Sequence, residues 1–175
     1  MDCICIINGD RPVKADTLGC GTETPVALSP PWNQAERLEA LAGYDILDSP
    51  REPEFDGIVR LAANVFEAPI AVVNLIAQDR QCFRAEVGIG ANELPLDVSI
   101  CAQAMLQPRI FVVPDSAKDV RFASNPLVTG NPGLRFYAGA LLETPKGLPL
   151  GTVSVLNTKP RRAVLPITNG SPSKC

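Results

Sequence analysis

The sequence contains no histidine among its 175 residues. Imidazole serves as the general base in Ser-His and Cys-His catalysis, and it is the commonest side chain that binds metals. Its absence excludes both kinds of catalysis from this chain, together with any phosphorylated histidine. It also leaves the cysteines without a partner for a mixed zinc site, so we expect no metal site and no cofactor.

Cysteines are few, and only two of the six lie close together in the sequence. This spacing favours free thiols in a reducing compartment over disulfides, with a metal or redox role as the alternative. The six are Cys3, Cys5, Cys20, Cys82, Cys101 and Cys175.

Long apolar runs and an excess of positive charge are also missing. No run approaches the roughly 20 residues that span a bilayer. The apolar stretch at residues 3–7 also lacks the basic residues that precede the apolar part of a signal peptide. The net charge of -3 offers no footprint for nucleic acid or an anionic membrane. We therefore expect a cytoplasmic protein that binds neither.

Both ends of the chain lack the period of a helix or strand. Residues 1–31 contain turn signals such as Asn8-Gly9, and Pro166 and Pro172 interrupt residues 162–175. We expect one folded domain over residues 32–161, between a flexible leader at 1–31 and a flexible tail at 162–175.

Two helices are predicted at the start of this domain. Asn33 followed by Glu36 resembles a capping box, and Leu38, Leu41 and Ala42 recur at helical spacing after it. Pro53 opens the second helix. We expect its apolar stripe to lie in the core rather than to bind a partner; the stripe is Phe55, Ile58, Leu61, Ala62, Val65 and Phe66.

Strand-like runs follow, separated by turn signals and one short helix. Because hairpins connect most of the strands, we expect an α+β domain with a mostly antiparallel sheet. The predicted strands are 70–77, 81–87 and 109–113 plus two in the hairpin 134–158; the short helix runs from Asp97 or Ser99 to Gln107, and 88–97 and 116–133 are loops.

The hairpin 134–158 has Thr144-Pro145-Lys146-Gly147 as its turn. If Thr144 opposes Gly147, Phe136 faces Val155 on a dry face and Tyr137 meets Ser154 on a polar one. A glycine bulge would shift this register by one residue and blur the two faces.

Two glycines in the hairpin strands, Gly139 and Gly151, suggest a close approach to the backbone. A covering helix that packs there is the favoured explanation, and a ligand is the alternative.

Several motifs in this order resemble a GAF domain, in particular those at the head of bacterial sensor histidine kinases and diguanylate cyclases. The resemblance covers about residues 33–161. It implies a profilin-like sheet with strand order 2-1-5-4-3, helices on both faces, and a small-molecule pocket roofed by the Ser99 helix and residues 115–133. The motifs include Tyr44-Asp45-Ile46-Leu47-Asp48, Asp79-Arg80-Gln81, Asn125-Pro126-Leu127-Val128, Arg135-Phe136-Tyr137-Ala138-Gly139-Ala140 and Leu150-Gly151-Thr152.

The resemblance implies a sensory and dimerisation module of bacterial signal transduction, of the kind found in two-component systems, without catalysis of its own. The proline-interrupted tail departs from the family, whose members continue into a long exit helix and an output domain. We expect neither here. The first helix would then leave Leu38 and Leu41 partly exposed, which predicts a weak homodimer or a separate signalling partner in trans.

Nine residues form the predicted pocket for an unknown small molecule. Hydroxyl, amide and guanidinium groups could orient an anionic or polar metabolite. The alternative is that Asp115 pairs with Arg121 to pin the loop and that Tyr137 forms hydrogen bonds inside the core. The nine are Ser99, Cys101, Asp115, Arg121 and Asn125 in the roof, with Arg135, Tyr137, Thr152 and Ser154 in the hairpin.

Two other functions stay open. Some GAF domains reduce free methionine sulfoxide with a thiolate and a resolving thiol, but only Cys82 and Cys101 lie in the predicted domain. Others carry a bilin on a cysteine, but Cys101 lacks the histidine that follows it at such sites. We expect no enzyme activity.

Overall fold

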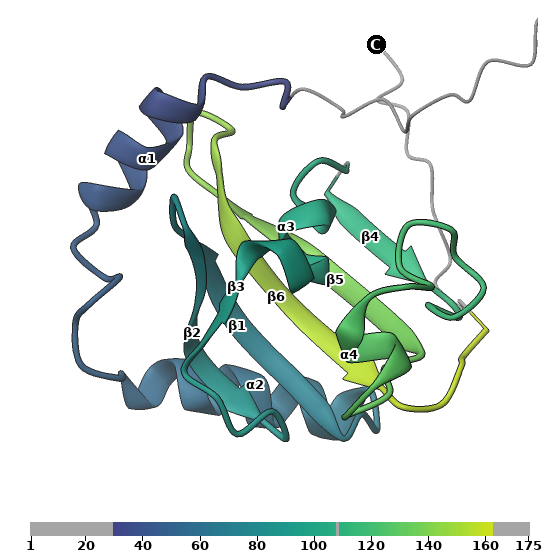
Figure 1. The fold of residues 1–175 in the computed structure, drawn as a ribbon. Coiled ribbons are helices and arrows are strands. Elements are labelled where there is room, and N and C mark those ends of the chain that lie inside the picture. Colours follow the sequence, from purple (N-terminus) through teal and green to yellow (C-terminus); the bar gives the residue numbers. More distant parts are fainter. Residues whose placement is uncertain (1–29, 108, 163–175) are drawn as a thin grey trace, which may run out of the picture.

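Six strands form one antiparallel sheet in the order β3-β2-β1-β6-β5-β4 (Figure 1). Apart from β3, this is the predicted order, and the α+β class is confirmed. The three residues of β3 were predicted as loop, and they pair with β2 at the edge of the sheet. The strands are β1 (Ile70–Ile76), β2 (Arg80–Val87), β3 (Glu93–Pro95), β4 (Ile110–Val113), β5 (Phe136–Glu143) and β6 (Pro149–Asn157).

The structure is a computed structural model that describes residues 30–107 and 109–162. The predicted leader, except for residues 30 and 31, and the predicted tail beyond residue 162 lie outside these residues.

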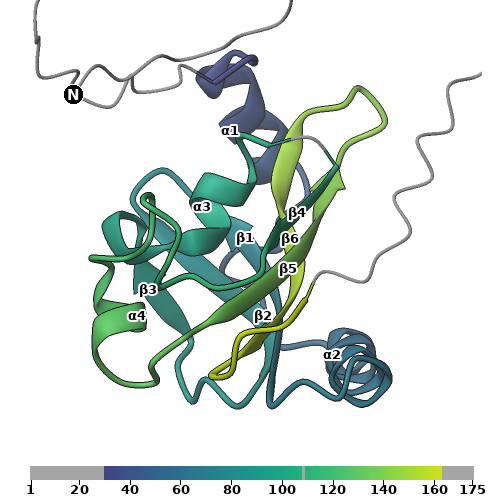
Figure 2. The same ribbon diagram turned by 90° about the vertical axis from the view of Figure 1, so that its right-hand side faces the viewer.

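Helices cover both faces of the sheet, as predicted (Figure 2). Apolar contacts place α1 and α2 on one face and α3 on the other. Asn33 caps α1 by accepting hydrogen bonds from the backbone N–H groups of Ala35 and Glu36. The helices are α1 (Gln34–Ala42), α2 (Pro53–Val65), the 3-10 helix η1 (Leu96–Val98), α3 (Ile100–Ala104) and α4 (Pro126–Thr129).

The β5–β6 hairpin turns at Thr144–Gly147, as predicted. The Gly147 N–H donates to the Thr144 carbonyl at 2.8 Å, and Gly147 has a φ of +80°, which glycine adopts without strain. The Thr144 N–H bonds to the Leu148 carbonyl, so Thr144 opposes Leu148 and not Gly147, and Gly147 is one extra residue on the β6 side of the hairpin. The register shift between Leu142 and Glu143 adds a second extra residue on the same side.

The two extra residues make the predicted register wrong by two positions. Phe136 pairs with Asn157 instead of Val155, and Tyr137 pairs with Leu156 instead of Ser154. Since side chains alternate with a period of two, this shift returns every residue to its predicted face. The separation into a dry face and a polar face is therefore correct although the pairing is not.

The hairpin glycines make room for neither a helix nor a ligand. A Cβ at Gly139 would collide with the Tyr137 hydroxyl, and a Cβ at Gly151 would collide with the Asn74 carbonyl. Gly139 thus lets the tyrosine ring lie along its own strand, and Gly151 lets β1 and β6 approach each other closely. Both explanations proposed from the sequence are wrong at these positions.

Helix α1 buries a different stripe from the predicted one. Leu41 is fully buried against Leu75 and Leu150, and Ala42 is exposed. The buried guanidinium of Arg37 donates to the Ile76 carbonyl at 2.8 Å. The expectation that Leu41 is partly exposed is therefore wrong, because the sheet covers it.

Helix α2 also contradicts the predicted core stripe. The residues that pack on the sheet are Val59, Phe55, Ala62 and Ala63. The rest of the predicted stripe faces outward: Ile58 is 44% exposed, Leu61 64%, Val65 66% and Phe66 46%.

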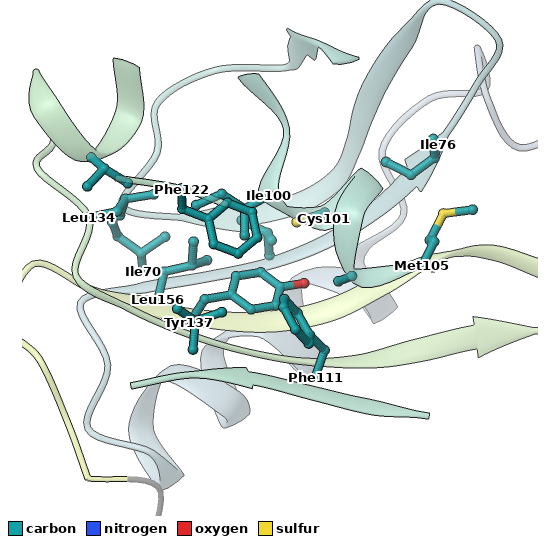
Figure 3. Close-up of a cluster of buried hydrophobic side chains, with 14 of the residues drawn as sticks. Ile70, Ile76, Ile100, Cys101, Met105, Phe111, Phe122, Leu134, Tyr137 and Leu156 are labelled. Atoms are coloured by element: carbon teal, nitrogen blue, oxygen red, sulfur yellow. The ribbon is translucent and has the colours of Figure 1, made fainter. Parts of the chain in front are cut away.

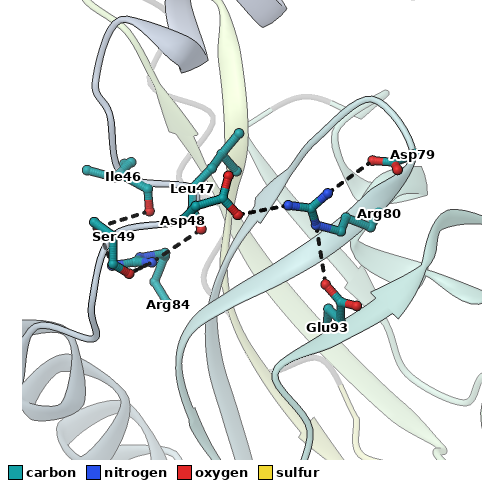
Figure 4. A network of polar contacts seen from close by, with 8 residues as sticks. All are labelled: Ile46, Leu47, Asp48, Ser49, Asp79, Arg80, Arg84 and Glu93. Carbon is teal, nitrogen blue, oxygen red and sulfur yellow. Dashed lines mark hydrogen bonds and ion pairs between the residues drawn. The ribbon is translucent and has the colours of Figure 1, made fainter.

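Arginines of β2 fasten the α1–α2 connector to the sheet (Figure 4). Arg84 is the extra residue where the β1–β2 register shifts, and its buried guanidinium donates to the carbonyls of Ser49 (2.9 Å) and Pro50 (2.8 Å). Arg80 pairs with Asp48 at 2.9 Å. A charged group taken from water needs such partners, so the connector has one defined path.

Gly151→Ala should destabilise the domain. The new methyl group meets backbone, which cannot rotate away, so we expect a loss of about 1–3 kcal/mol in the free energy of unfolding. Gly57→Ala is the matched control: a Cβ there meets nothing within 4 Å, and replacing a helical glycine should stabilise by about 0.5–1 kcal/mol. Urea unfolding measures both, and equal effects would contradict the close β1–β6 approach.

Candidate functional site

A chain of buried hydrogen bonds crosses three strands on the α3 side of the sheet. Tyr137 OH lies 2.9 Å from Ser154 Oγ, which lies 2.7 Å from Thr152 Oγ1. Asn74 Nδ2 donates to Thr152 Oγ1 at 2.8 Å. These four residues, at most 1% exposed, are called the polar chain below. Three of the predicted pocket residues therefore meet, but inside the core.

Apolar side chains surround the Tyr137 end of the polar chain (Figure 3). The ring of Phe111 lies 5.9 Å from that of Tyr137, and Cys101 Sγ lies 3.9 Å from Ser154 Oγ. Burial, with a smaller contribution from Cys101, raises the pKa of Tyr137 well above 10.0. The alternative that Tyr137 forms hydrogen bonds inside the core is confirmed.

Two roof residues hold the covering segments in place. Ser99 caps α3 by accepting from Ala102 N–H, and its hydroxyl bonds to the Gln81 side chain. Asn125 caps α4, and its Nδ2 donates to the Val98 carbonyl at 3.0 Å. These side chains close the roof over the polar chain.

The three charged residues of the predicted pocket lie outside the polar chain. Arg121 forms a bidentate pair with Asp119 at 2.8 and 2.6 Å, and hydrogen bonding lowers the pKa of Asp119. The predicted Asp115–Arg121 pair is therefore wrong. Asp115 instead lies 3.9 Å from Arg135 and 3.7 Å from Lys118.

The space between roof and sheet is small and apolar. The cavity measures about 20 Å³, which is room for roughly one water molecule. Of the nine predicted residues, Cys101 alone lines it. A metabolite therefore does not fit here without movement of the roof. The lining residues are Val72, Gln81, Phe83, Ile89, Leu94, Ile100, Cys101, Leu127, Leu134 and Leu156.

Polar residues that the sequence reasoning did not place in the site are central to it. Asn74 anchors the polar chain, and its Oδ1 has no hydrogen-bond partner among the described residues. Gln81 fixes the roof through Ser99. Asn74 had one signal in the sequence, as the polar residue in an otherwise apolar strand. Gln81 belongs to the Asp79-Arg80-Gln81 motif of the family resemblance, but that motif did not indicate a contact with Ser99.

Within residues 30–107 and 109–162, no group of three histidine, cysteine or carboxylate side chains could hold a metal ion. Cys101 lies on the α3 side of the sheet, and Cys82 is paired with Leu75, whose side chain packs toward α1 on the other side. In the same part of the chain, no helix is both long and apolar enough to cross a membrane.

Tyr137→Phe should cost about 1 kcal/mol of stability, because it removes one hydrogen bond and leaves Ser154 bonded to Thr152. Tyr44→Phe, at a side chain 49% exposed, should change stability little. Thermal unfolding compares them, and equal shifts in melting temperature would contradict the role of the buried hydroxyl.

Alkaline pH should destabilise the domain through the same residue. In the folded state the pKa of Tyr137 lies above the ordinary value of 10.0. The stabilisation that the protonated hydroxyl gives the folded state is therefore complete below pH 10, and it declines as the pH rises toward the pKa of the folded state. The slope reaches about 1.4 kcal/mol per pH unit. Urea unfolding between pH 9 and 11 should show this slope in the native chain. If the free energy of unfolding of Tyr137→Phe had the same pH dependence as that of the native chain in this range, the role of Tyr137 would be contradicted.

The chain is similar in sequence to part of one bacterial signalling enzyme. The chain is 37% identical over 135 residues to a cyclic di-GMP phosphodiesterase of Pseudomonas aeruginosa; the match covers 76% of this chain but 23% of that protein. The chain thus spans about a quarter of that relative. None of the family models compared matches it.

Two solved structures show the same architecture at low sequence identity. The GAF domain of an Acinetobacter phosphoenolpyruvate-protein phosphotransferase has a TM-score of 0.52 and 19% identity, over 74% of this chain and 80% of that one. The free methionine-R-sulfoxide reductase of Neisseria meningitidis has a TM-score of 0.51 and 14% identity, over 73% and 75%. The described residues therefore have the GAF fold that the sequence motifs indicated.

Proposed function

We propose that this domain is a sensory and regulatory module of bacterial signal transduction, and that it associates through α2. The observation that carries the proposal is the outward apolar stripe of Ile58, Leu61, Val65 and Phe66, which are 44–66% exposed. Several large apolar side chains side by side on one helix favour contact with a partner over contact with water.

The association surface thus differs from the one expected from the sequence. Leu41 of α1 is buried against Leu75 of β1 and Leu150 of β6 and cannot contribute. A homodimer through α2 is the simplest form of the proposal, because a twofold axis lets one stripe pack on its own copy. A separate partner in trans would use the same surface.

Small-molecule sensing belongs to the proposal as a second, coupled step. The cavity of about 20 Å³ is too small for a metabolite, so binding would require the roof of η1, α3 and α4 to open. Breaking the Ser99–Gln81 and Asn125–Val98 hydrogen bonds would release it. The polar chain includes the Asn74 Oδ1 acceptor, which bonds to no residue that the structure describes, and it would then offer several groups to a polar ligand.

The phosphodiesterase relative suggests the kind of output. The match covers about a quarter of that protein, so most of the phosphodiesterase lies outside the matched part. We therefore propose that domains of this type regulate cyclic di-GMP turnover in an attached or separate protein. We also propose that the domain acts in the cytoplasm, where its thiols stay reduced.

The domain itself is proposed to be non-catalytic. A thiol-dependent reductase needs a nucleophilic thiol beside a resolving one, whereas Cys82 and Cys101 lie on opposite sides of the sheet. Covalent attachment of a bilin needs an accessible thiol, and Cys101 is 4% exposed. Both observations support a regulatory role.

Leu61→Glu tests the association directly. A charge introduced into a desolvated apolar contact should raise the dimer dissociation constant at least about tenfold, equivalent to roughly 1.4 kcal/mol. Val120→Glu is the matched control, because Val120 is 93% exposed and lies in the loop before α4. Sedimentation velocity over a concentration series measures both. A native chain that stays monomeric, or equal effects of the two variants, would contradict association through α2.

A further inference from the structure

An apolar groove lies beside α2 on the face of the sheet that this helix covers only in part. Helix α2 lies mainly over β1 and β2 (Figure 1), and the groove of about 200 Å³ lies next to it over β5 and β6. Its floor is low because Ala138 and Ala140 carry only methyl groups, and Ile110 at its rim is 60% exposed. The groove can therefore accept large apolar side chains from another molecule.

The outward apolar stripe of α2 is continuous with this groove. Ala62 lines the groove. Ile58 lies four residues before Ala62 and Val65 lies three residues after it, so the three are neighbours on one side of the helix. Leu61 adjoins both Ile58 and Val65 and extends the stripe farther from the sheet. Groove and stripe thus form one apolar surface, which is larger than the stripe alone.

The two ends of α2 carry opposite charges. Glu54 lies in the first turn, and it is exposed. At the other end, the Arg161 guanidinium donates to the carbonyls of Phe66 and Glu67. Within residues 30–107 and 109–162, neither Glu54 nor Arg161 forms an ion pair. Both charges are therefore available to a partner of complementary charge.

We propose that a second copy of this chain binds to this surface, with its α2 antiparallel to the first and over the groove. The inference rests on the proposed association through α2 and specifies its geometry. With a twofold axis near Leu61, positions at equal distances from the axis meet, so Ile58 of each copy contacts the partner's Val65. Leu61 of each copy then lies in the partner's groove against Ala140.

The same geometry brings the free charges together. Glu54 lies seven residues before Leu61, whereas Phe66 and Glu67, whose carbonyls hold Arg161, lie five and six residues after it. An antiparallel pair of helices therefore places Glu54 of each copy beside the partner's Arg161. The dipoles of the two helices are also opposed in this orientation, which is favourable at both ends.

A second copy fits this surface better than an unrelated helix does. The chain itself supplies both halves of the contact, since its large apolar side chains on α2 complement its own low alanine floor, and each contact occurs twice in a twofold dimer. Helix α2 then has apolar partners on two sides. That accounts for its apolar residues outside the face that packs on its own sheet.

Ala140→Glu tests the groove contact. Because Ala140 is exposed in the single copy, the variant should fold, as thermal unfolding will show. A charge beneath the partner's Leu61 should raise the dimer dissociation constant at least about tenfold in sedimentation velocity. Ala123→Glu is the matched control, because Ala123 is also an exposed alanine and lies in the loop before α4. It should leave the dissociation constant unchanged.

A charge exchange tests the antiparallel orientation. Glu54→Arg and Arg161→Glu should each raise the dimer dissociation constant about fivefold, because each places like charges together at two sites of the dimer. The double variant restores opposite charges and should return to within about twofold of the native value. A purely structural role of Arg161 at the end of α2 would give no such rescue.

The outcomes separate this geometry from the proposed function. If Leu61→Glu weakens the dimer and Ala140→Glu does not, association through α2 stands and the groove contact is overturned. If the double variant dimerises no better than the single ones, the antiparallel orientation is overturned. A native chain that stays monomeric overturns both the geometry and the association.

Discussion

The hydrogen bonds of Tyr137, Ser154, Thr152 and Asn74 link β5, β6 and β1 in the centre of the sheet. Polar groups buried to this extent are tolerated only when they bond to one another, so these strands have one relative position. Gly139 is part of the same constraint, because a side chain there would displace the tyrosine hydroxyl. The faces of the hairpin, and hence the helices that cover each face, follow from this arrangement.

This constraint gives the two sides of the sheet different structures, on which the two proposed functions depend. On the α3 side, the roof closes on the polar chain and leaves a cavity of about 20 Å³, so any sensing there must begin with an opening. On the other side, α2 packs on the sheet through Phe55, Val59, Ala62 and Ala63 and presents four other large side chains to solvent. Association through α2 therefore needs no rearrangement, whereas ligand binding does.

Much of the fold could be predicted because local signals decide it. The Asn33 cap, the Thr144–Gly147 turn and the alternation along the hairpin each depend on neighbouring residues. The register could not be predicted, because the two extra residues on the β6 side of the hairpin depend on pairing geometry.

The face of α2 could not be predicted either. A helix that carries both alanines and larger apolar residues can pack on a sheet through either kind of side chain. Here the residues that pack closely on the sheet include Val59, Ala62 and Ala63. The structure brings three of the predicted hydroxyls together, but inside the core, and Arg121 bonds to Asp119 two residues away. Spacing in the sequence does not reveal such pairings.

The most direct test of the account is methyl NMR of the native chain over a concentration series. The account predicts concentration-dependent shifts at Ile58, Leu61 and Val65, with constant shifts at Val72 and Leu156, which line the closed cavity. Constant shifts at the three α2 residues up to the highest soluble concentration would contradict it.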